Sequence, residues 1–134
     1  MKLILTILIL LLVAGCASKE SLPPQGMADE IRIEQTHPST ELLILRNKEK
    51  IEGVIAFVNI KKDGWSVPWY GPPVGQIYLN MYKNEKFVGN FYVGPNFFGR
   101  DYGNFLSQPA SKEEIKKLGK LLGFDLLGNV NAAQ

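Results

Sequence analysis

Residues 76–93, QIYLNMYKNEKFVGNFYV, decide the fold of this chain. Their first seven side chains alternate between apolar and polar, so every second one points to the same face of a strand. A second apolar run follows a short polar stretch that contains Asn84, a residue that tolerates a positive φ. The pattern predicts two antiparallel strands joined by a tight hairpin.

Further strand signals lie on both sides of this hairpin. Isoleucines alternate with charged residues over 30–34, and a second apolar run, 41–46, follows the turn sequence THPST. On the C-terminal side, residues 97–98 and 104–107 predict two short strands across GRDYG. Because hairpins dominate, we expect a mainly antiparallel sheet of about five to six strands.

The clearest helix signal covers residues 112–122. Ser111 occupies the N-cap position, and Glu114 follows three residues later in the pattern of a capping box. Apolar residues recur at helical spacing between them and Gly123, a residue typical of helix C-caps. This stretch predicts an amphipathic helix with a lysine-rich outer face.

Residues 48–61 fit two interpretations. The apolar run 54–58 is rich in β-branched residues, as strands are. The same stretch also places its apolar residues on one helical face, with Asn47 as an N-cap and Glu49 in the first turn, where the helix dipole favours acids. We interpret the segment as a helix, and the strand remains the alternative.

These elements predict an α+β domain, in which helices 48–61 and 112–122 pack on one face of the antiparallel sheet. Residues 29–127 are expected to form one domain, which is long enough to fold on its own core. Residues 128–134 are expected to fray.

The first fifteen residues have the character of a secretory signal. Lys2 precedes an eleven-residue segment, 3–13, whose one polar residue is a threonine, and small residues follow it. A membrane-spanning helix needs about 20 apolar residues, so this segment is too short to span a bilayer. We therefore interpret residues 1–15 as a signal peptide that is cleaved.

The end of this segment, Val13-Ala14-Gly15-Cys16, resembles the lipobox of bacterial lipoproteins. The resemblance implies that Cys16, the only cysteine, carries a diacylglycerol and becomes the first residue of the mature protein. Each buried CH₂ contributes about 0.8 kcal/mol to membrane binding, so two or three acyl chains form a lasting anchor. Ala17-Ser18 follow instead of an aspartate, which by the same resemblance implies the outer membrane, facing the periplasm. In a Gram-positive cell the anchor would hold the outer face of the only membrane.

Residues 16–28 combine small and polar residues with Pro23, Pro24 and Gly26, and are expected to form a flexible tether. The formal net charge of the whole chain is only +2, which gives no broad electrostatic attraction for nucleic acid. We expect the membrane, reached through the lipid on Cys16, to be one partner of the protein.

Catalytic and metal-binding patterns are weak in this sequence. His37 is the only histidine, and with Cys16 lipidated the usual ligands of a zinc site are missing. Serines occur without a nucleophile motif, and no Gly-rich phosphate-binding motif is present. We therefore expect no cofactor, no metal and no enzymatic activity.

Two aromatic loops are candidate binding surfaces. The first, WSVPWYGPP at residues 65–73, offers Trp69 and Tyr70 on a proline-stiffened connection; Trp65 is better interpreted as core filling. Whether Trp69 and Tyr70 are core or surface stays open.

The second loop, GPNFFGRDYGN at residues 94–104, offers Phe98, Arg100 and Tyr102. Aromatic rings beside an arginine are common in recognition surfaces. The favoured alternative is an ordinary hairpin with Phe97 in the core and an Arg–Asp pair at its tip.

The sequence therefore predicts a lipid-anchored, non-catalytic binding or accessory module of the cell envelope. Its partner would be an envelope protein or peptidoglycan, bound through Trp69, Tyr70, Phe98, Arg100 and Tyr102. An inhibitor or immunity lipoprotein that blocks a hydrolase or toxin is the alternative, and an enzyme acting on the cell wall is a third hypothesis.

Overall fold

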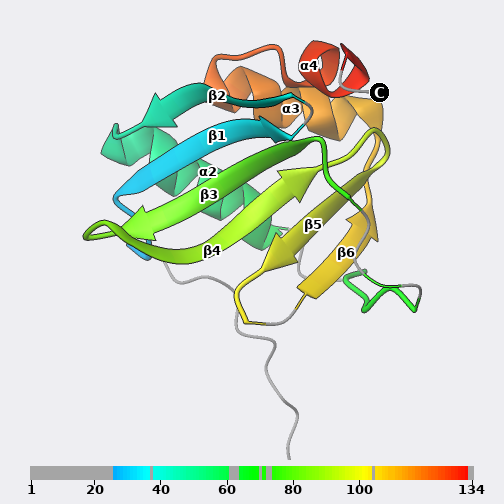
Figure 1. Cartoon of the computed structure of the whole chain (residues 1–134), viewed down its shortest axis with the longest axis horizontal. Coiled ribbons are helices and arrows are strands. Elements are labelled where there is room, and N and C mark those ends of the chain that lie inside the picture. Colours follow the sequence, from blue (N-terminus) through cyan, green and yellow to red (C-terminus); the bar gives the residue numbers. More distant parts are fainter. Residues whose placement is uncertain are drawn as a thin grey trace, which may run out of the picture.

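The computed structural model describes residues 26–36, 38–60, 64–69, 71, 74–103 and 105–132. Within them, six strands form one sheet in the order β2-β1-β3-β4-β5-β6, with three helices (Figure 1). The strands are β1 (Glu30–Thr36), β2 (Ser39–Leu45), β3 (Ile77–Lys83), β4 (Lys86–Val93), β5 (Phe97–Asp101) and β6 (Phe105–Pro109). The helices are α2 (Lys48–Ile60), α3 (Lys112–Leu122) and α4 (Leu126–Ala132).

The predicted central hairpin is confirmed as β3 and β4. Asn84 and Glu85 form its two-residue turn with φ values of 49° and 64°. Two positive φ values in succession match the right-handed twist of a hairpin, and the asparagine at the first position adopts its value at little cost. The Asn84 amide also donates to Asp29 Oδ2 at 2.9 Å, which ties the turn to the start of β1.

Every strand pair in the sheet is antiparallel. The predicted hairpins β1–β2 and β5–β6 both form, and β1 also pairs with β3 at the centre of the sheet. The prediction of an α+β domain built on an antiparallel sheet is therefore confirmed. His37, which follows the last residue of β1 in the sequence, lies outside the described residues.

One face of the sheet carries the core, and Figure 1 shows α2 and α3 behind it. The interpretation of residues 48–61 as a helix is correct, with α2 ending at Ile60. Asn47 caps it, because its Oδ1 accepts the Lys50 amide at 3.0 Å. The apolar face that the sequence places on this helix is buried against the sheet: Ile51, Val54, Ile55 and Val58.

Helix α3 begins with the predicted capping box. The Ser111 hydroxyl accepts the Glu114 amide at 3.2 Å, and a Glu114 carboxylate oxygen accepts the Ser111 amide at 2.7 Å. Gly123 ends the helix in the left-handed conformation, with φ 71°. The capping box gives a hydrogen-bond acceptor to two amides that the start of the helix would otherwise leave without a partner.

A Ser111→Ala substitution is expected to lower the free energy of unfolding by about 1 kcal/mol, because it removes the N-cap acceptor. Urea denaturation followed by circular dichroism measures this change. Ser39→Ala is the control, since Ser39 is an exposed residue at the start of β2 and its loss should cost less than about 0.5 kcal/mol. Equal effects of the two substitutions would contradict a structural role for the capping box.

The prediction that residues 128–134 fray is wrong as far as Ala132, because α4 occupies them. Leu126 and Val130 lie one helical turn apart and are both buried in the core. Asp125 begins the helix, with its Oδ1 accepting the Gly128 amide at 3.0 Å. Two buried anchors on a seven-residue helix are too few to produce a recognisable periodic pattern.

The N-terminal boundary of the domain lies earlier than the predicted residue 29. Ala28 is buried in the core, and the Gly26 amide donates to Glu52 Oε1 on α2 at 3.1 Å. The end of the predicted tether 16–28 therefore packs against the domain. Residues 1–25, with Cys16, lie outside the described part of the chain. No helix of the described residues is long and apolar enough to cross a membrane.

Candidate binding groove

Phe98 lies in the core and not on a binding surface, which corrects its assignment as a surface residue. Its exposed fraction is 0%, and its ring packs edge-on against Phe57 of α2 at 5.8 Å between centroids. Neighbouring side chains of a strand point to opposite faces, so the adjacent Phe97 lies on the other side of the sheet. The alternative hairpin prediction, with Phe97 in the core, is therefore wrong by one residue.

Arg100 is also an interior residue, at 2% exposure, and its assignment to a binding surface is wrong. Its guanidinium carbon lies 4.5 Å from the ring centroid of Trp65, close enough for a cation–π interaction. Trp65 itself is buried, as favoured, and packs edge-on against Phe91. Asp101 accepts the Gly103 amide at 3.0 Å within the turn.

Tyr102 folds back onto the sheet. A Cβ at Gly89 would lie 2.2 Å from the Tyr102 ring, so the glycine leaves room for it, and the Tyr102 hydroxyl donates to Met81 Sδ at 3.5 Å. Burial raises the pKa of the Tyr102 hydroxyl, which keeps it neutral. Tyr102 therefore acts mainly in packing.

Trp69 has the opposite environment, with 93% of the residue exposed. Val67 and Val74 in the same connection are 74% and 67% exposed. Three large apolar side chains in one loop expose surface that folding normally buries. Tyr70, the remaining predicted surface residue, lies outside the described residues.

A groove of about 410 Å³ lies beside Trp69, and we call it the Trp69 groove. Residues 66–69 line one side, and Asn96, Phe97 and residues 107–109 line the other. Ser66 and Ser107 exchange two backbone hydrogen bonds of 2.9 Å, which fix the loop to the edge strand β6. Figure 1 shows the loop in bright green, standing away from the sheet next to β6.

The wall of the groove at Phe97 is supported by a row of aromatic rings. Tyr92 lies between Tyr78 and Phe105, with stacked centroids 5.2 Å away on each side, and Phe97 meets Tyr92 edge-on at 6.4 Å. Tyr92 crosses β5 at Gly99, where a Cβ would lie 2.0 Å from its ring. Burial raises the pKa of the Tyr92 hydroxyl. This packing holds Phe97 in place.

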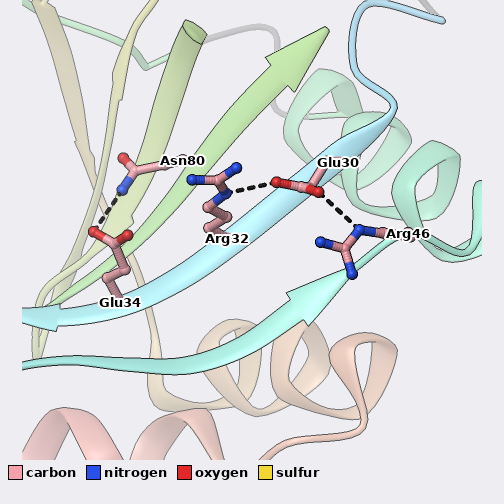
Figure 2. Close-up of polar contacts among 5 residues, drawn as sticks. All are labelled: Glu30, Arg32, Glu34, Arg46 and Asn80. Atoms are coloured by element: carbon pink, nitrogen blue, oxygen red, sulfur yellow. Dashed lines mark hydrogen bonds and ion pairs between the residues drawn. The ribbon is translucent and has the colours of Figure 1, made fainter. Parts of the chain in front are cut away.

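Another cavity, of about 210 Å³, lies at the start of β1 and is lined mostly by charged residues. Figure 2 shows Glu30 between Arg32 and Arg46, which donate to it at 2.6 and 2.8 Å. These hydrogen bonds, that of Arg32 foremost, lower the pKa of the Glu30 carboxyl. The same figure shows Asn80 donating to Glu34 at 3.0 Å. Within the cavity Glu30 pairs with both arginines, so it is a weaker candidate for a ligand than the Trp69 groove.

The chain was compared with protein families, with curated proteins and with solved structures, and none of them matches it. Among the described residues, no three histidine, cysteine or acidic side chains gather closely enough to hold a metal ion. The Trp69 groove and the sequence of the N-terminal segment are the features of this chain that point to a function.

Of the four predicted surface residues that the structure describes, only Trp69 lies at an almost fully exposed position beside the groove. Sequence reasoning missed the opposite wall, formed by Asn96, Phe97 and residues 107–109. Those residues approach the loop only through the pairing of Ser66 with Ser107, 41 positions apart in the chain. No local pattern in the sequence signals such a contact.

Proposed function

We propose that this chain is a lipid-anchored lipoprotein of the cell envelope whose domain is a non-catalytic binding module. The lipobox-like sequence that ends at Cys16 supports the anchor, and Ala17-Ser18 support the outer membrane, facing the periplasm. The Trp69 groove is the binding surface. The exposure of Trp69 on a loop with a fixed base is the observation that carries this proposal.

The energetics of Trp69 favour a binding role. An aromatic side chain of this size buries about 150–250 Å² when it is covered, which corresponds to about 4–6 kcal/mol of hydrophobic free energy. In the domain alone almost none of that free energy is gained, because 93% of Trp69 remains in water. A partner that covers Trp69 gains part of it, because the entropy lost on association offsets the rest, and tryptophan is among the residues most enriched at binding hot spots.

An inhibitor or immunity protein is the second candidate function. Val67, Trp69 and Val74 expose three large apolar side chains, and exposed apolar side chains are what an inhibitor would insert into the cleft of an incoming enzyme. An inhibitor would bind a purified hydrolase or toxin one to one, and cells without it would become sensitive to that enzyme. An accessory module would instead purify with an envelope complex or with cell-wall material.

A photoreactive residue at position 67, irradiated in intact cells, tests the proposed surface. Val67 lines the Trp69 groove and is mostly exposed, so covalent adducts to an envelope protein or to peptidoglycan are expected there. Mass spectrometry identifies what is attached. Position 87 is the control, since Phe87 is 56% exposed and lies at the turn end of β4. Absence of adducts at position 67, or the same adducts at both positions, would contradict the proposal.

A further inference from the structure

We infer that the Trp69 groove binds a neutral saccharide; this inference rests on the binding function proposed above and specifies its ligand. A sugar ring has an apolar C–H face and a rim of hydroxyl groups. Its binding site therefore combines an exposed aromatic face with side chains that donate and accept hydrogen bonds at the rim.

The groove combines these two kinds of group. Trp69 is 93% exposed, and Phe97 lines the groove while the aromatic row supports it from behind. Ser66 and Asn96 are exposed polar residues in the same lining, and Ser107 is half-buried beside them. Hydroxyl and amide side chains both donate and accept hydrogen bonds, as the hydroxyl groups of a sugar require.

The absence of charge distinguishes a neutral sugar from an acidic ligand. Among the residues that the structure describes, the groove is lined by residues 66–69, 96–97 and 107–109, and none of these is a lysine, arginine, histidine, aspartate or glutamate. A phosphate or carboxylate buried there would lose its water without gaining a charged partner. A lipid head group or an acidic peptide is therefore disfavoured.

The backbone of β6 argues against an extended peptide. A peptide that adds to a sheet edge needs free N–H and C=O groups along the edge strand. At this edge, Ser107 already exchanges both of its groups with Ser66, and Pro109 has no N–H to offer. Side-chain recognition of a sugar needs neither group.

Calorimetric titration with tetra-N-acetylchitotetraose, a neutral oligosaccharide, tests the inference. The protein is purified from membranes as the cell produces it, in a detergent whose head group is not a sugar. We expect saturable binding with a dissociation constant of about 1 mM or tighter, weakened about tenfold or more by Trp69→Ala. Trp69→Phe keeps an aromatic face and should retain part of the affinity. Phe87→Ala, a second exposed aromatic truncation, should leave it unchanged.

Tryptophan fluorescence gives an independent readout of where the sugar lies. The protein has two tryptophans, Trp65 buried at 9% exposure and Trp69 at 93%. Quenching by acrylamide therefore reports mainly Trp69, and the bound sugar should protect it. Protection in the wild type that disappears in Trp69→Phe supports the inference.

Two results would overturn the inference. The first is no binding of tetra-N-acetylchitotetraose or of cellotetraose, a second neutral probe. The second is equal weakening by Trp69→Ala and Phe87→Ala. If a protein adduct forms at position 67 while both sugars fail to bind, the binding module stands and the saccharide is excluded. Failure of the sugars together with no adduct at position 67 removes both proposals.

Discussion

A Cys16→Ser variant is expected to carry no fatty acid, to keep residues 1–15 and to leave the outer-membrane fraction. A serine hydroxyl cannot form the thioether to which the diacylglycerol of a lipoprotein is attached. Two or three acyl chains hold a protein to a bilayer almost permanently, whereas an apolar segment as short as residues 3–13 does not span one. The expected change is thus a nearly complete loss of anchoring.

Metabolic labelling with an alkyne fatty acid and mass spectrometry of the N-terminus measure this result. The chain has a single cysteine, which makes a second control direct. If Cys16 carries lipid, the denatured wild-type protein from membranes should not react with a maleimide. An unlabelled wild type with a reactive thiol, or a labelled Cys16→Ser variant, would remove the proposed anchor.

A Phe98→Ala variant is expected to lose about 3–5 kcal/mol of stability. Phe98 is fully buried between Phe57 and Phe91, so its truncation removes apolar surface and leaves a cavity. The free energy of unfolding of a small domain is about 5–15 kcal/mol in total, so much of it would be lost. The urea midpoint should fall by about 2 M.

Phe87→Ala is the matched control for Phe98. Phe87 is 56% exposed and meets the Tyr82 ring edge-on at 5.8 Å, so its loss should cost less than about 1 kcal/mol. A one-residue shift in the register of β5 would exchange the environments of Phe97 and Phe98. If Phe98→Ala were as mild as Phe87→Ala, the pairing of Phe98 with Val93 would be wrong.

The elements that sequence reasoning predicted well are those with a local cause. Asn84 marks the central hairpin because its own backbone adopts the required φ, and Ser111 with Glu114 mark α3 because they cap it. Helix α4 was missed because only Leu126 and Val130 anchor it. Its stability comes from packing against the rest of the domain, which no window of sequence contains.

The candidate surface was harder to predict than the fold. Phe98, Arg100 and Tyr102 are residue types typical of a binding surface. The alternation of side chains along β5 instead buries Phe98 and Arg100, and the turn after β5 packs Tyr102 against the sheet. Arginine is rarely buried in a protein core, so its residue type alone favours a surface position for Arg100. The sequence does not decide whether Trp69 lies in the core or on the surface, because a tryptophan in a loop can fill either position.

The loop that carries Trp69 is attached to β6 through its backbone, so its side chains can change without loss of that attachment. The two bonds between Ser66 and Ser107 join main-chain atoms, so they do not depend on which side chains the loop carries. Val67, Trp69 and Val74 contribute little to the core, and other residues there should be compatible with the same scaffold. The domain is thus suited to evolving new ligand preferences, and a library randomised at these three positions could be selected for retargeted binders.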